Sequence, residues 1–141
     1  MDFEFIRTYA PMYVEAAKLT ISIAFFGILL STFWGFICCV IRYYKIPVLN
    51  RVIGVYIELS RNTPLLIQLF FLYFGLPKLG IFLSSEACGV LGLTFLGGSY
   101  MAEAFRSGLE AIPVIQNEAG LSLGLTKWKV LKYFVLPQAA V

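Results

Sequence analysis

A run of residues without any charged side chain, from position 19 to position 41, restricts this chain more than any other feature of its sequence. As a helix rising about 1.5 Å per residue, this run is long enough to cross a hydrocarbon core of about 30 Å. A buried helix of a soluble protein seldom runs this long without a polar face. The chain is also 60% apolar and only 13% charged, whereas soluble domains are about a quarter charged. We therefore expect an integral membrane protein.

Two further apolar segments predict an all-α bundle of about three transmembrane helices. Residues 52–76 are interrupted by Glu58, Arg61 and Pro64, and residues 87–105 are rich in Gly. In the last segment, Gly98-x-x-x-Ala102 has the spacing that lets two helix backbones approach closely in lipid. Residues 1–18 alternate aromatic and charged side chains, which suits either a short interfacial segment or a frayed tail, with Pro11 limiting any regular helix.

The distribution of basic residues predicts the orientation of these spans. With the N-terminus outside, seven basic residues lie inside, three lie outside and Arg61 lies within the membrane. The positive-inside rule therefore favours an outer N-terminus and a cytoplasmic C-terminus. The seven inner residues are Arg42, Lys45, Arg51, Arg106, Lys127, Lys129 and Lys132.

Residues 113–137 are too polar to span a membrane, and we expect them to form two short cytoplasmic helices separated at Gly124. Thr126 is a candidate N-cap of the second helix, and Pro137 is expected to end it. Its Trp128 recurs at helical spacing with other apolar residues, opposite three lysines, as in a basic amphipathic helix beside a membrane surface.

The sequence offers no chemistry for catalysis. It has no His, and its three cysteines form no Cys-x-x-Cys pair, so metal ligation and Cys-His catalysis are not expected. The phosphate-binding pattern Gly-x-x-x-x-Gly-Lys-Ser/Thr is absent as well. We predict no catalytic residue, no metal site, no cofactor and no nucleic-acid partner.

A group of polar residues inside the second apolar segment is the candidate for a translocation path or gate. Glu58 and Arg61 share a helix face, Thr63 follows, and Pro64 should kink or break the helix. The alternative is an interfacial ion pair that reaches the cytoplasmic surface. Gln68, farther along, is either an interhelical hydrogen-bonding residue or a lining residue for a polar substrate.

A resemblance to a known family adds to this interpretation. The stretch "EAGLSLGLTKWKVLKYFVLP", residues 118–137, resembles the cytoplasmic coupling loop of type I ABC importer permeases. The positions in register are Glu118, Ala119, Gly124, Leu136 and Pro137, whereas Gly120 stands where the family usually has Ala. Residues 58–74, "ELSRNTPLLIQLFFLYF", and 100–113, "YMAEAFRSGLEAIP", resemble the permeases for polar amino acids such as His, Glu, Gln, Arg and opines.

The resemblance implies a set of partners and a location. It implies a multi-pass subunit of the plasma (inner) membrane that pairs with a second permease subunit. A cytoplasmic ATP-binding subunit would dock on the coupling loop, Gly120 included, and hydrolyse the ATP. An extracytoplasmic binding protein would deliver the amino acid, and the spans would then alternate between outward and inward access.

One departure from the family keeps an alternative open. Members of the family usually have five spans, and this sequence ends at Val141, where a fourth would begin. We therefore expect either a fragment or a natural truncation. The alternative function is that of a small non-transporting membrane protein, for assembly or regulation, which retains the ATPase-docking loop.

Overall fold

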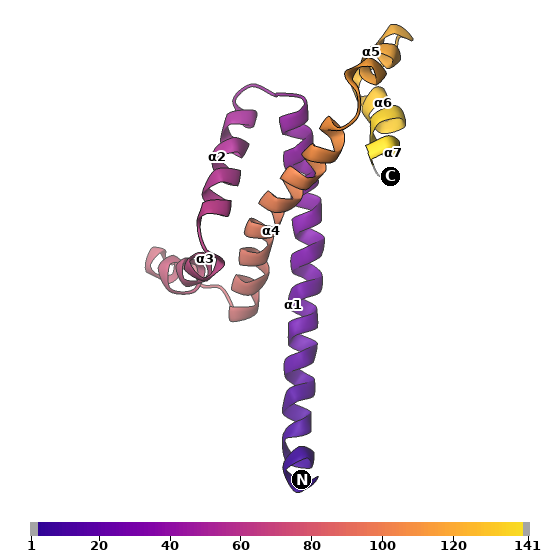
Figure 1. Ribbon diagram of the computed structural model, residues 1–141. Helices are drawn as coiled ribbons and strands as arrows, with labels where there is room; N and C mark the ends of the chain where they lie inside the picture. Colours follow the sequence, from indigo (N-terminus) through magenta and orange to yellow (C-terminus); the bar gives the residue numbers. More distant parts are fainter. Residues whose placement is uncertain (1–2, 140–141) are drawn as a thin grey trace.

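The computed structural model describes residues 3–139, and within that range the chain is helical without any strand (Figure 1). This confirms the expected all-α class. Two prolines, Pro77 and Pro137, each follow a short π-helical turn, Phe71–Gly75 and Leu131–Val135 respectively. The α-helices are α1 (Phe3–Tyr43), α2 (Leu49–Asn62), α3 (Leu65–Phe70), α4 (Ser85–Glu110), α5 (Val114–Ser122), α6 (Lys127–Val130) and α7 (Leu136–Ala139).

Helix α1 is longer than the sequence suggested. It continues through Pro11, so the expected limit on regular helix at that residue is wrong. A proline removes only its own backbone donor, and the helix on its C-terminal side keeps every other hydrogen bond. Within the described part of the chain, Tyr9–Tyr43 is the one helix long and apolar enough to cross a membrane, with a mean hydropathy of 2.2.

Helices α1 and α4 pack along each other through small residues. Of all the helix pairs, these two make the most extensive contact. A Cβ atom added at Gly35 would lie 2.5 Å from Met101 Cβ and 2.9 Å from the carbonyl oxygen of Gly98. Ser31 donates a hydrogen bond of 3.1 Å to the Leu93 carbonyl across the same contact. Close backbone approach, predicted from Gly98 and Ala102, therefore occurs against α1.

Helix α2 packs on α4 through hydroxyl groups. Tyr56 and Ser60 both donate to the carbonyl of Phe95, at 2.6 and 3.0 Å. Beside them, Ile53 and Ile57 of α2 are buried against α1 and α4 in a shared apolar cluster. Helix α2, which forms the first half of the expected second span, is thus anchored to α4.

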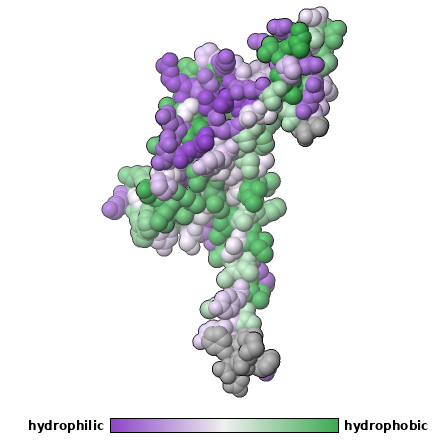
Figure 2. All heavy atoms as spheres, in the orientation of Figure 1, coloured by the Kyte–Doolittle hydropathy of each residue, from purple (hydrophilic) through white to green (hydrophobic). Residues whose placement is uncertain are grey.

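Three helical passes lie side by side near the α1–α2 loop, and the N-terminal part of α1 extends beyond the other two (Figure 1). Helix α1 runs from the N-terminus to the end that holds the α1–α2 loop, α2 returns, and α4 leads back to the short helices α5, α6 and α7 (Figure 1). Figure 2 shows hydrophilic residues gathered over the end that holds the α1–α2 loop, with a mainly hydrophobic surface below it. The hydrophilic surface in this view therefore gathers at the end that holds the α1–α2 loop, and the C-terminal helices lie near that end.

Candidate functional site

Helix α5 projects at the end of the molecule opposite the N-terminus (Figure 1). Pro113 starts it with a φ of −57°, the value that the proline ring fixes and that suits entry into a helix. Glu118 and Ala119, two of the residues predicted to contact an ATPase, are exposed on this helix. A carboxylate beside a small side chain leaves the backbone of α5 open to close approach by a partner.

Gly120, also predicted to take part in the docking contact, does not belong to that exposed surface. Gly120 is buried, and a Cβ atom at this position would lie 2.8 Å from Cγ2 of Val130 on α6. The absence of a side chain therefore serves the packing of α5 on α6 within the chain.

The turn between α5 and α6 lies where the sequence predicted it. Gly124 has a φ of +75°, in the left-handed region that favours glycine, and no atom lies within 4 Å of a Cβ built there. Thr126 caps α6 by accepting a hydrogen bond of 3.4 Å from the Lys129 amide. Gly124 is thus required for the backbone conformation of the turn and not for close packing.

Leu136 and Pro137 lie farther along and have different surroundings. Leu136 packs against a buried cluster that includes Leu109 of α4 and Val135. Pro137 is exposed and lies inside α7, so the expectation that it ends the second helix is wrong. The π-helical turn just before it widens the backbone, which relieves the clash between the proline ring and the preceding turn.

Two tyrosines at the end of α1 fix the position of these short helices. The Tyr43 hydroxyl and the side-chain amide of Asn117, on α5, lie 2.9–3.2 Å apart, and the Tyr44 hydroxyl donates to the Lys127 carbonyl at 3.0 Å. Neither contact was expected from the sequence. Each one joins α1 to a helix more than 70 positions away in the chain.

The break between α2 and α3 is where the sequence placed it. Thr63 is extended, with φ −109° and ψ 123°, and Pro64 precedes the first turn of α3. The Gln68 amide donates to the carbonyls of Ser60 and Thr63, at 3.0 and 2.9 Å. These are C-terminal carbonyls of α2 that the break leaves without helical partners. Gln68 therefore closes the break from the α3 side, and its own Oε1 is buried without a partner.

The predicted pairing of Glu58 with Arg61 is not observed. No ion pair within 4 Å joins them in the part of the chain that the structure describes. Arg61 instead lies over the ring of Tyr100 on α4, with its guanidinium carbon 5.1 Å from the ring centroid. This cation–π contact points Arg61 across the helix pair rather than along α2.

Both residues border an open polar hollow of about 500 Å³ between α2 and α4. Two guanidinium groups, two carboxylates and an amide line it, so it presents both signs of charge. Its lining residues are Arg42, Gly54, Ile57, Glu58, Arg61, Asn62, Tyr100 and Glu103.

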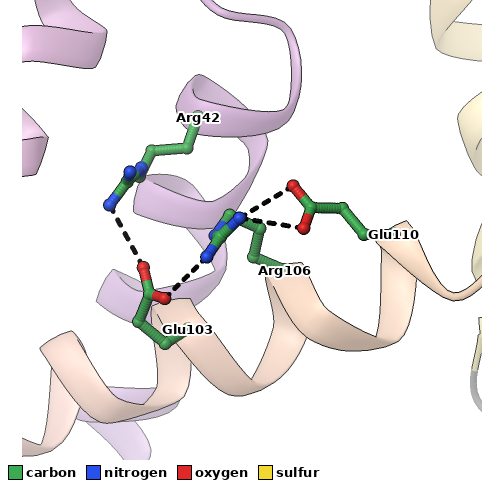
Figure 3. Close-up of polar contacts among 4 residues, drawn as sticks. All are labelled: Arg42, Glu103, Arg106 and Glu110. Carbon is green, nitrogen blue, oxygen red and sulfur yellow. Dashed lines mark hydrogen bonds and ion pairs between the residues drawn. The ribbon is translucent and has the colours of Figure 1, made fainter.

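A chain of ion pairs at this hollow joins α1 to α4 (Figure 3). Glu103 contacts Arg42 at 3.1 Å and Arg106 at 2.8 Å, and Arg106 also contacts Glu110 at 2.8 Å. The sequence signal for part of it was present, because Glu103, Arg106 and Glu110 follow one another at three- and four-residue spacing. The link to Arg42 depends on tertiary packing.

Helix α4 therefore connects the two candidate regions. Glu103 borders the polar hollow, and Leu109, two turns farther, is buried in the cluster that holds α6 and the following turn. Helix α4 is continuous between the two regions. It assembles no pair of a nucleophile and a base.

Comparison with known proteins identifies relatives that match nearly the whole chain. Residues 27–141 match the family described as binding-protein-dependent transport system inner membrane component. The chain is 39% identical over 140 residues to the probable glutamine ABC transporter permease protein GlnP of Bacillus subtilis, covering 96% of this chain and 64% of the relative. It is 36% identical to the probable amino-acid ABC transporter permease protein PatM of Vibrio harveyi, covering 98% of this chain and 63% of that protein.

A solved structure has the same fold. It is the crystal structure of an amino acid ABC transporter with histidines, which matches with a TM-score of 0.85 and 31% sequence identity. The match covers 99% of this chain and 65% of the solved chain. The chain thus spans a little under two thirds of the length of these relatives.

Proposed function

The chain belongs to the family of binding-protein-dependent transport system inner membrane components, and we propose that it forms membrane-spanning structure in an ATP-driven importer of polar amino acids. The exposed helix α5, with Glu118 and Ala119 on its surface, carries this proposal. A short helix that projects from a membrane bundle, yet is tied to it through Tyr43 and Asn117, suits the transfer of movement from a partner.

The first part of the proposal is the membrane arrangement. Residues 19–41, 52–76 and 87–105 cross the inner membrane, with residues 1–18 on the outer side and the coupling loop, 113–137, in the cytoplasm. The polarity difference between the two ends in Figure 2 supports this arrangement. The basic residues of the α1–α2 loop and of α6 then share the cytoplasmic side.

The second part is the docking of a cytoplasmic ATP-binding subunit on α5. Glu118 and Ala119 supply the contact, and Gly124 supplies the turn that lets α5 project. Gly120 and Leu136 act within the chain, since both pack against its own core, whereas Pro137 is exposed. ATP hydrolysis takes place in the partner, and this chain converts the partner's closure into movement of α4.

The third part is the path. The hollow beside Glu58 and Arg61 offers carboxylate and guanidinium groups, which match the ammonium and carboxylate of an amino acid. The break at Thr63 and Pro64, closed by Gln68, places a hinge at the same helix. A second permease subunit and an extracytoplasmic binding protein complete the importer. The similarity to a probable glutamine permease and a probable amino-acid permease supports polar amino acids as the cargo.

Uptake in the native cell tests this function. Disruption of the coding sequence should abolish uptake of at least one radiolabelled polar amino acid, and the wild-type gene should restore it. The Glu118→Lys gene should fail to restore uptake although its product reaches the membrane. Unchanged uptake, with the chain still bound to an ATPase subunit, would support the non-transporting assembly or regulatory protein instead.

A further inference from the structure

The loop between α1 and α2, residues 44–48, exposes apolar side chains at the polar end of the molecule. Ile46 is 37% exposed, Val48 is 76% exposed, and Leu49, the first residue of α2, is 47% exposed. Within the described chain these side chains lack the cover that an apolar group in water normally finds. Nothing in the proposed transport function uses them.

The backbone of this loop is strained at two residues. Val48 has φ 65° and ψ −60°, and Lys45 has φ 50°. A β-branched residue at positive φ is a conformational outlier, because its side chain crowds the backbone there. Strain of this kind persists where other contacts over-determine the conformation, and it concentrates at binding sites. Backbone hydrogen bonds within the chain hold this conformation, from the Leu49 amide to the Pro47 carbonyl at 2.7 Å and from the Asn50 amide to the Ile46 carbonyl at 2.8 Å. They leave the Val48 side chain largely exposed.

The same loop carries positive charge. A hollow of about 470 Å³ runs along it, lined by two basic and one amide side chain and by no acidic one. Its lining residues are Lys45, Pro47, Val48, Asn50, Arg51 and Val52. In Figure 2 the hydrophilic surface gathers over this end of the molecule. The hollow is thus suited to an anion that has apolar groups attached to it.

The position of the loop identifies the anion. In the proposed membrane arrangement the first span ends at residue 41, three residues before the loop, so the loop would lie beside the lipid headgroups. We propose that the loop binds anionic phospholipid, with Lys45 and Arg51 contacting the phosphodiester and Ile46, Val48 and Leu49 entering the upper acyl region.

Charge complementarity selects lipid over the ATPase subunit as the occupant. The surface proposed for the ATPase exposes the carboxylate of Glu118, whereas the hollow along this loop is lined by two cations, one amide and apolar groups, without a carboxylate. An anionic phospholipid matches both the basic side chains, through its headgroup, and the exposed apolar side chains, through its acyl chains. This site rests on the membrane location of the family and is independent of transport.

A fluorescence experiment on the full chain tests the site. The chain with Val48→Cys, labelled with an environment-sensitive dye, is reconstituted in phosphatidylcholine nanodiscs that contain phosphatidylglycerol. Cys38, Cys39 and Cys88 are buried, so the engineered thiol is the accessible one among the described residues. Spin-labelled phosphatidylglycerol should quench the dye several-fold more than spin-labelled phosphatidylcholine at the same mole fraction.

Two charge variants make the result specific. Lys45→Gln with Arg51→Gln should abolish the preference for phosphatidylglycerol, and Lys45→Arg with Arg51→Lys should retain it. The matched control, Lys18→Gln with Lys78→Gln, removes two exposed charges elsewhere and should also retain it. Equal quenching by the two lipids, or an unchanged preference in the first variant, would overturn the site. So would a dye that neither lipid quenches and that only added ATPase subunit shields, which would assign the loop to a protein contact.

Discussion

Arg42 Nη1 lies 3.1 Å from Glu103 Oε1, and this ion pair joins the end of α1 to α4 beside the polar hollow. Both side chains are partly exposed, 28% and 23%, so solvent screens the attraction to some degree. Glu103 also contacts Arg106, which makes the pair one part of a longer network. The pair restrains α1 and α4 beside the hollow, before α4 leads on to the proposed docking loop.

A double-mutant cycle on Arg42 and Glu103 measures that restraint. We expect Arg42→Gln and Glu103→Gln each to lower thermal stability in detergent, and a coupling energy of about 1 kcal/mol between them. Arg106 and Glu110 form the matched control, because their pair lies on one helix and is more exposed. A coupling energy between Arg42 and Glu103 no larger than experimental error would show that this ion pair does not restrain α1 and α4.

The contact of Gly120 with Val130 predicts an unusual response to a helix-favouring change. Gly120→Ala should raise intrinsic helix propensity by up to about 1 kcal/mol, yet we expect net destabilisation. The new methyl group would lie 2.8 Å from a stiff, buried side chain, and overpacking of this kind costs about 1–3 kcal/mol. Thermal unfolding of the purified chain measures the difference. Adding Val130→Ala should restore part of the loss, whereas a stabilised Gly120→Ala chain would contradict the packing.

Gln68 is predicted to hold the break between α2 and α3 closed. Gln68→Leu should destabilise the chain by about 1–3 kcal/mol, because the carbonyls of Ser60 and Thr63 lose their donor. Gln138→Leu is the control, since Gln138 donates one exposed hydrogen bond to Phe134 within the same helical region. If the two substitutions lower the free energy of unfolding equally, the hydrogen bonds of Gln68 do not stabilise the break.

Cysteine labelling tests the proposed orientation. Ser85, at the start of α4, and Lys127, at the start of α6, are both exposed. Substitution of Ser85 does not remove the hydroxyl of Ser84, which caps α4. In cells, Ser85→Cys should react with an impermeant thiol reagent from outside, and Lys127→Cys only after permeabilisation. The reverse pattern would invert the topology and place α5 on the side without ATP.

The sequence predicted the features that depend on local chemistry. The break at Pro64 and the turn at Gly124 both follow from backbone restrictions of single residues, and both lie at the expected positions. The small-residue contact was half predicted. Gly98 and Ala102 were recognised, whereas the stripe on α1 that includes Gly35 was not, although it repeats at four-residue spacing.

Tertiary contacts account for what the sequence did not predict. Glu58 and Arg61 share a helix face, yet Arg61 lies over Tyr100, because α4 offers an aromatic ring at that point. Gly120 was expected on the outside and is buried by Val130, which follows the turn and folds back on α5. In each case the deciding neighbour belongs to another helix, so spacing along one helix could not identify it.

Recovery of the ATPase subunit with the chain tests the central claim, that exposed residues of α5 dock it. We expect Ala119→Trp to block close approach and Glu118→Lys to weaken binding by about 2–5 kcal/mol if the charge is buried on docking. Both side chains are exposed in the chain itself, so its folding should be unaffected. Ala17→Trp and Glu86→Lys are the matched controls, at exposed positions on α1 and α4. The account predicts at least a tenfold lower recovery of ATPase with each α5 variant than with its control; equal recovery would contradict it.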